Sequence, residues 1–183
     1  MEWWPENFKL YKKFKKTSYR KYKLIVIDNG SKDDSIEKLK RINNKIIFIR
    51  LSKNNGYTIA QNIGWKYALE KLNASYVCAM DSDIEVIQKN WLELIIKEME
   101  KDQKIGISSG KLVFPDNRLQ LLYFERERKN YDELDKGQYN FIRDVEAVGG
   151  ACIVIKREVI RKIGYYDENF FYGPNDIDFC FRA

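Results

Sequence analysis

Two aspartates stand one residue apart at the end of a short apolar run in this chain of 183 residues. The run is Tyr76–Met80, and Asp81 and Asp83 follow it in a DXD motif. If the run is a buried strand, both carboxylates emerge at its carboxyl end, where open α/β sheets place their ligands. Hard divalent cations such as Mg²⁺ and Mn²⁺ take oxygen ligands of this kind, usually with substrate phosphates. The pair predicts a metal and diphosphate site, with a solvated turn as the structural alternative.

The composition restricts the chemistry that such a site can use. The chain has 27 acidic residues and no histidine, which excludes histidine as a base or metal ligand within it. We therefore expect any catalytic base to be a carboxylate. Cys78, Cys152 and Cys180 each lie in an apolar run, so buried thiols are expected rather than a disulfide framework or zinc cluster.

The net charge of +6 is concentrated near the amino terminus, where Lys9–Lys23 carries eight basic residues and no acidic one. A solvated helix face is the favoured interpretation, and peripheral contact with anionic membrane lipid is the functional alternative. No nucleic-acid partner is expected. Because no apolar run approaches the length of a membrane span and no secretory leader is evident, we predict a cytoplasmic, at most membrane-peripheral, protein.

Short apolar runs alternate with stretches of helical periodicity along most of the chain. This alternation predicts one α/β domain over 1–183, with a mostly parallel sheet flanked by helices. The charged and aromatic stretch 118–143 is predicted to be a long binding loop or lid. Strands are expected at 23–27, 46–49, 76–80, 105–108 and 151–155, and helices at 6–16, from Asp33 or Asp34 to about 42, 58–72, 90–101 and 158–163.

Four groups of residues stand in a distinctive order along the chain. They are Ile25–Ser31, then Asn54–Tyr57 with Asn62–Gly64, then Met80–Asp83, and finally Gly149–Ala151, Gly164–Glu168 and Asn175–Arg182. Together they closely resemble the catalytic domain of glycosyltransferase family 2, the nucleotide-diphospho-sugar transferases of the GT-A fold. The resemblance implies a Rossmann-like domain involved in polysaccharide biosynthesis. It also implies that the first strand of the fold is missing here and that the chain is truncated at both ends.

The resemblance implies specific roles for individual residues. Asp83 would ligate a divalent cation, Mn²⁺ or Mg²⁺, and Asp81 would contact the ribose or the metal shell. Asp176 matches the catalytic base, which takes a proton from the acceptor hydroxyl in an inverting displacement. The remaining substrate-binding positions would be Asp28 at the nucleotide base, Gly56 and Asn62 along the nucleotide pocket, and Gly150 and Asn175. The implied partners are a nucleotide-diphospho-sugar donor and a glycan or glycolipid acceptor.

Each of these roles has a structural alternative. Asp28 could build the turn after its strand, Gly150 could allow a close backbone approach, and Asp178 could pair with Arg182 if that segment is helical. Two positions depart from the family, which commonly has an acid at Asn175 and a cation at Gln61. The missing ends of the family domain motivate the alternative function, a truncated, non-catalytic, nucleotide-binding pseudoenzyme or partner subunit of the same fold.

Overall fold

The computed structural model describes residues 17–42, 45–120, 123–124 and 133–183, and the expected helix at 6–16 lies outside them. The first sheet joins β1 (Ile25–Asp28) and β2 (Ile47–Arg50) in parallel, with Ile25 opposite Ile47 and Asp28 opposite Arg50. Helix α2 (Ser35–Ile42) connects the two strands, and its buried Leu39 packs with Ile46 and their neighbours. This βαβ unit follows the expected order of elements.

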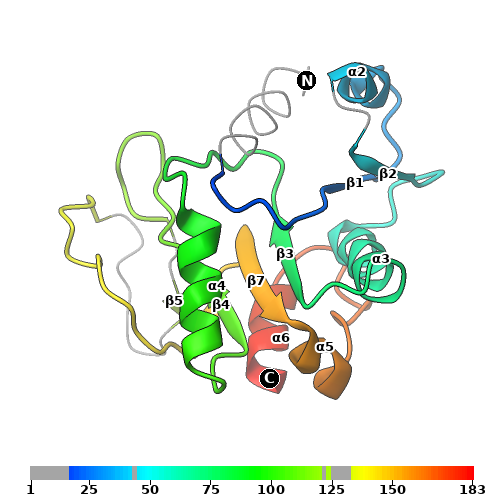
Figure 1. Ribbon diagram of the computed structural model, residues 1–183. Helices are drawn as coiled ribbons and strands as arrows, with labels where there is room; N and C mark the ends of the chain where they lie inside the picture. Colours follow the sequence, from blue (N-terminus) through cyan, green and yellow to red (C-terminus); the bar gives the residue numbers. More distant parts are fainter. Residues whose placement is uncertain (1–16, 43–44, 121–122, 125–132) are drawn as a thin grey trace.

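A second sheet forms the centre of the molecule (Figure 1). Its middle strand, β7 (Cys152–Lys156), pairs with β3 (Tyr76–Met80) on one side and β4 (Ile107–Ser109) on the other. Both pairings are antiparallel. A third, separate sheet is the two-stranded antiparallel ladder of β5 (Tyr123–Phe124) and β6 (Ala147–Val148).

Four further helices surround these strands, with α4 in front of the central sheet and α6 behind it (Figure 1). Because successive strand residues face opposite ways, β7 supplies two hydrophobic clusters. Val154 packs with Met99 and its neighbours on α4, whereas Ile153 and Ile155 join Trp65 on the other face. The helices are α3 (Tyr57–Glu70), α4 (Trp91–Lys101), α5 (Arg157–Ile163) and α6 (Asn175–Arg182).

The expected α/β class is confirmed, but the expectation of a mostly parallel sheet is wrong in its detail. Among the described ladders only β1 with β2 is parallel. An apolar run has the same periodicity in either direction, so the sequence does not reveal that β7 runs opposite to β3. The positions of the other expected strands and helices within the described residues agree with the structure to within about two residues. Sequence reasoning did not anticipate β5 or β6, and it considered a helix at α6 only as the condition for pairing Asp178 with Arg182.

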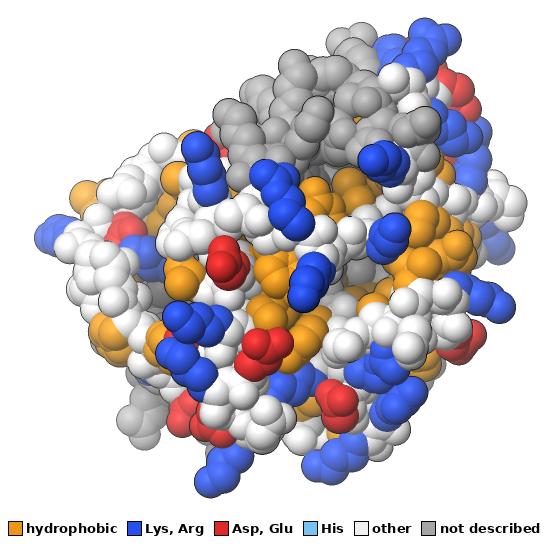
Figure 2. Space-filling view, viewed as in Figure 1, with side chains coloured by type: hydrophobic (Ala, Val, Ile, Leu, Met, Phe, Trp, Pro, Cys, Tyr) orange, Lys and Arg blue, Asp and Glu red, His pale blue; other side chains and the backbone are white. Residues whose placement is uncertain are grey.

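The described residues include the end of the basic segment and all three cysteines, of which Cys152 is buried and Cys78 and Cys180 are partly buried. Figure 2 shows Lys and Arg spread around a band of hydrophobic side chains on this face. The structure describes only the end of the basic segment Lys9–Lys23, and Arg20 is exposed there. Cys152 is buried, and all three cysteines are free thiols. Within the described residues, no helix has the length and apolar character needed to cross a membrane.

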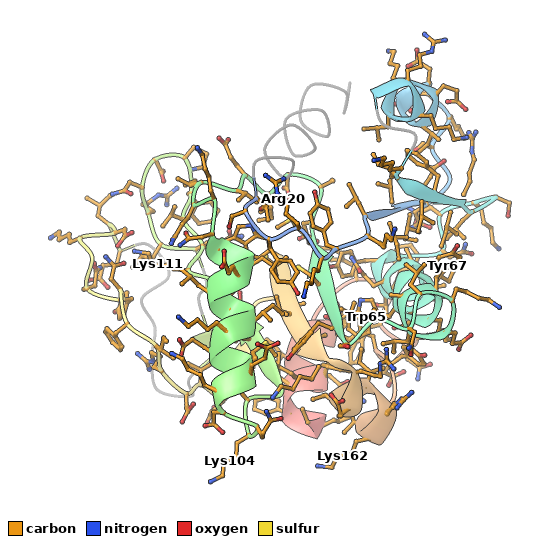
Figure 3. All side chains as sticks on the ribbon, in the orientation of Figure 1. Arg20, Trp65, Tyr67, Lys104, Lys111 and Lys162 are labelled. Atoms are coloured by element: carbon orange, nitrogen blue, oxygen red, sulfur yellow. The ribbon has the colours of Figure 1, made fainter. Side chains whose placement is uncertain are left out.

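The core behind the central sheet is organised by three aromatic rings. Trp65 lies between α3 and β3 (Figure 3), and it packs on Tyr166 and Phe179 at centroid distances of 4.4 and 5.4 Å. Phe179, on α6, is fully buried and lies 5.2 Å from Tyr166. The rings therefore fix α6 against α3, which sets the position of every residue at the start of α6.

Replacing Phe179 with alanine is expected to destabilise the protein by about 3–5 kcal/mol, because it removes a buried ring and leaves a cavity. Phe181→Ala is the matched control on the same helix, since Phe181 is 53% exposed, and its expected cost is below about 1 kcal/mol. Urea denaturation followed by circular dichroism measures both. Equal costs for the two variants would contradict this account of the core.

Candidate active site

The carboxyl end of β3 carries the two aspartates of the DXD motif. The Asp81 amide donates a hydrogen bond to the Ala151 carbonyl, 2.9 Å away, which continues the β3–β7 ladder by one residue. The Ile84 amide donates to the Asp81 carbonyl, so the chain turns directly after the strand. Asp81 is half-buried and Asp83 is exposed. The turn therefore places one carboxylate against the protein and the other toward solvent.

The Asp81 carboxylate has an unusual electrostatic environment. Burial, the largest influence, together with the nearby carboxylates of Asp83 and Asp176, raises the pKa of Asp81 to about 6, against the opposing effect of the Tyr57 hydroxyl. Its Oδ1 atom is buried and has no hydrogen-bond partner. The predicted metal ligands and the predicted base are thus close enough for their charges to influence one another.

Asp176 lies in the first turn of α6, and both of its carboxylate oxygens accept hydrogen bonds from backbone amides. Oδ2 accepts from the Gly150 amide at 2.6 Å, and Oδ1 accepts from the Ile177 amide at 2.9 Å. A Cβ atom at Gly150 would lie 3.0 Å from the Asp176 Cβ atom. Gly150 therefore belongs to the site because its small size admits Asp176, and it agrees with the close-approach alternative.

Asn175 precedes Asp176 at the start of α6. The residue is 3% exposed, and its Nδ2 atom is buried with no hydrogen-bond partner. A buried amide without a partner is costly, so such groups are frequently completed by water or ligand. Asn175 thus lies beside the predicted base, but its substrate contact stays a prediction.

Asp28 ends β1 and is almost fully buried. Its Oδ1 atom accepts a hydrogen bond from the Ser31 amide at 2.8 Å, and its Oδ2 atom lies 3.1 Å from Nε of Arg50. These contacts agree with the turn alternative, and the contact with a nucleotide base stays a prediction. A pocket of about 370 Å³ adjoins this turn and is lined by Gly30, Ser31, Lys32, Arg50, Leu51 and Ser52.

The loop after β2 is tied to the loop after β1 through Asn29. The Asn29 amide group donates to Asn54 and to the Gly56 carbonyl, and its Oδ1 atom accepts from the Asn55 amide. Gly56 has φ 89°, and a Cβ atom there would lie 2.7 Å from the Phe171 carbonyl oxygen. Only glycine fits both conditions, so Gly56 fixes the start of α3 beside the 171 segment.

Asn62 does not lie open to a nucleotide in this structure. The residue is 1% exposed, and its amide group donates to the Tyr166 carbonyl and to Glu168. Its oxygen accepts from the Tyr166 amide. These bonds fasten α3 to the segment before α6, and the contact of Asn62 with a nucleotide stays a prediction.

Two further residues belong to the site, although sequence reasoning did not select them. Arg50 contacts Asp28 only because the parallel register places the two side by side, and that register is not visible in the sequence. Tyr57 follows Gly56 directly, but nothing in the sequence distinguishes it from an ordinary core aromatic. The predicted pairing of Asp178 with Arg182 is present, at 2.8 Å.

The residues at the end of β3 fit a divalent cation that is shared with a ligand. Among the described residues there is no group of three or more acidic, cysteine or histidine side chains that could enclose a metal. Mg²⁺ is commonly held by one or two carboxylates together with substrate phosphates, and it does not require an all-protein cage. Asp81, whose Oδ1 atom is free of partners, and the exposed Asp83 match that arrangement.

Comparison with known sequences gives a consistent result. Residues 9–164 match the sequence model of Glycosyl transferase family 2. The chain is 26% identical over 168 residues to the low-salt glycan biosynthesis hexosyltransferase Agl10 of Haloferax volcanii, covering 87% of this chain and 52% of that protein. It is 26% identical over 152 residues to the poly-beta-1,6-N-acetyl-D-glucosamine synthase of Staphylococcus aureus, covering 81% of this chain and 36% of that protein.

Solved structures share the GT-A fold. The mannosyltransferase PcManGT of Pyrobaculum calidifontis, solved with GDP-Man and Mn²⁺, aligns with a TM-score of 0.65 at 17% identity, over 96% of this chain and 48% of its own. GalNAc-T7, solved with UDP, GalNAc and Mn²⁺, aligns with a TM-score of 0.68 at 18% identity, over 98% of this chain and 38% of its own. The chain thus spans about half or less of these relatives.

The raised pKa of Asp81 makes a prediction about stability. A buried carboxyl that prefers its neutral form destabilises the folded protein above its folded pKa, and the cost disappears below its unfolded value near 4. Asp81→Asn removes that cost, so the variant should gain stability over the wild type at pH 7.5, by about 1–2 kcal/mol after solvent screening. The gain should shrink toward pH 4. Urea titrations at the two pH values measure it, and an equal difference at both would contradict the assigned environment.

Proposed function

Since this chain belongs to Glycosyl transferase family 2, we propose that it transfers a sugar from a nucleotide-diphospho-sugar to a hydroxyl group of a glycan or glycolipid acceptor, with inversion. The single observation that supports this most is the convergence of Asp81 and Asp176, which lie far apart in the sequence. The Asp81 amide donates a hydrogen bond to the Ala151 carbonyl and the Gly150 amide donates one to the Asp176 carboxylate, so adjacent residues of one segment hold the two aspartates. In the proposed reaction Asp81 would help to hold the cation that stabilises the leaving group, and Asp176 would take the acceptor proton.

The proposed step is a single displacement. The acceptor oxygen forms a bond to the anomeric carbon, the bond from that carbon to the diphosphate oxygen breaks, and the acceptor proton passes to the Asp176 carboxylate. Each Asp176 oxygen accepts one backbone hydrogen bond, which orients the carboxylate and leaves further lone pairs for a proton. When bound at Asp81 and Asp83, a Mn²⁺ or Mg²⁺ ion would neutralise the charge of the departing nucleoside diphosphate.

A second candidate function is nucleotide binding without turnover. It is favoured by Asn175, whose buried amide has no hydrogen-bond partner and which stands where the family resemblance implies an acid. An amide cannot accept the acceptor proton or share a negative charge with Asp176. The loss of sugar transfer and donor hydrolysis, with nucleotide binding retained, would distinguish this pseudoenzyme from the transferase.

We also propose a cytoplasmic location and peripheral membrane contact through Lys9–Lys23. Three unpaired thiols support a reducing compartment, where disulfides are rare. Arg20, Lys21 and Lys23 are exposed and available to anionic lipid, and the rest of the basic segment lies outside the described residues.

Asp83→Ala is expected to abolish the metal-dependent part of nucleotide binding, because it removes the exposed oxygen ligand of the pair. Isothermal titration with UDP, GDP and dTDP sugars, in Mn²⁺ and in EDTA, measures this. Glu100→Ala is the control, since Glu100 is exposed near the end of α4, at the opposite end of the central sheet. If neither the wild type nor Asp83→Ala binds any donor in Mn²⁺ or Mg²⁺, the proposed active site is wrong.

Gly150→Ala is expected to lower turnover at least tenfold with nucleotide binding retained, because its methyl group would displace Asp176, and Asp176→Asn should abolish turnover. Gly110→Ala is the matched control, since a Cβ atom there meets only Ile95, at 4.0 Å. Release of nucleoside diphosphate measures turnover. Full activity of Asp176→Asn would remove Asp176 from its role as the base.

A further inference from the structure

Phe171 and Tyr172 are adjacent aromatic residues that remain largely exposed in the segment leading into α6. Their exposed fractions are 63% and 79%. A single exposed hydrophobic side chain is ordinary on a protein surface, whereas a group of them next to a site marks a surface that binds something. Asp176 follows Tyr172 by four residues. Because an extended chain advances at most about 3.6 Å per residue, the Cα atoms of these two residues lie within about 14 Å of each other.

The backbone of this exposed segment is held in place by the start of α3. The Phe171 carbonyl accepts a hydrogen bond from the Tyr57 amide at 2.9 Å. A Cβ atom at Gly56 would lie 2.8 Å from Cδ2 of the Phe171 ring, so the edge of that ring lies against the Gly56 backbone. The Gly56 carbonyl in turn accepts from the Asn29 side chain at 3.0 Å. A surface that is already ordered in this way loses little entropy when a ligand binds.

The Tyr172 ring is supported on one side and open over most of its area. It meets the Tyr57 ring in an edge-to-face contact, with a centroid distance of 6.1 Å and an interplanar angle of 84°. Such a contact is favourable and fixes the orientation of one ring relative to the other. Since Tyr172 is 79% exposed, the rest of its surface is available to a ligand.

An open aromatic face next to Asp176 suits one part of the reactants better than the others. The negative face of an aromatic ring attracts weakly positive C–H groups, which one face of a sugar ring presents, while the sugar hydroxyls stay free at the ring edge. A diphosphate is recognised by cations instead. The pocket beside Asp28 is lined by residues 30–32 and 50–52, which belong to other loops. The acceptor sugar, whose hydroxyl must reach Asp176, is therefore the matching occupant.

We propose that Phe171 and Tyr172 form a stacking surface for a sugar ring of the acceptor, which makes the acceptor a glycan that presents an apolar C–H face. The inference rests on the proposed function, since it takes Asp176 as the group that receives the acceptor proton. The two rings orient the acceptor and take no part in the bonds that form and break. Their contribution therefore lies in acceptor affinity.

The test measures glycan binding to the full chain saturated with Mn²⁺ and UDP, by saturation-transfer difference NMR. The probes are chitotetraose, maltotetraose and mannotetraose. We expect the wild type to bind at least one of them and Tyr172→Ala to bind it about tenfold more weakly, as the loss of one aromatic contact predicts. Tyr172→Phe, which keeps the ring, should restore the affinity. Phe181→Ala removes an exposed ring at the other end of α6 and should bind as the wild type does.

A parallel UDP titration in Mn²⁺ separates the possible failures. If Tyr172→Ala binds the glycan as tightly as the wild type, or if the wild type binds none of the three glycans, the stacking surface is wrong and the proposed function stands. If Tyr172→Ala loses UDP affinity to the same extent as glycan affinity, the segment serves the nucleotide or the fold, and the inference is wrong. If the wild type binds no UDP in Mn²⁺, the proposed nucleotide site fails, and the inference fails with it.

Discussion

The antiparallel ladder between β3 and β7 is the contact on which the site depends. Its register places Met80 opposite Cys152, and the Asp81 amide extends the ladder to Ala151. The end of β3 therefore lies beside Gly150, which in turn receives the Asp176 carboxylate. A shift of one residue would turn the side chains of β7 to the opposite faces and separate these groups. The buried alternation of β7 between α4 and the aromatic core opposes such a shift.

The three aspartates at the end of β3 and the start of α6 repel one another. Asp81, Asp83 and Asp176 lie close enough for the last two to raise the pKa of the first. Like charges in a partly buried site are unfavourable unless a cation or a proton compensates them. A nucleotide diphosphate brings further negative charge, so a cation would favour both partners at once. The site is therefore better suited to a ternary complex of protein, cation and nucleotide than to a metal held by protein alone.

Much of this could be predicted from the sequence, for reasons that differ between elements. The Tyr76–Met80 strand was predicted with its observed bounds, because a compact apolar run bounded by polar residues permits few alternatives. Helix α3 agreed within two residues because its apolar spacing is helical over a long stretch. The convergence of Asp81 with Asp176 followed from family resemblance, since periodicity says nothing about two elements so far apart.

Other features could not be predicted because they depend on register and long-range packing. The direction of β7 is decided by the path of the chain between β4 and β7, and an apolar run gives no information about it. The hydrogen bonds of the Asn62 side chain to Tyr166 and Glu168 are revealed by no local pattern in the sequence.

The central claim is that the DXD carboxylates and Asp176 form the two sides of one site. Paramagnetic broadening by Mn²⁺ in the presence of UDP tests it directly, because the effect reports proximity to the ion in solution. We predict selective broadening of the backbone amide signals of Gly150 and Ile177, the two amides that hold Asp176, while Lys104 beyond the far end of α4 is unaffected. Undisturbed signals from Gly150 and Ile177 in a complex saturated with Mn²⁺ and UDP would contradict it.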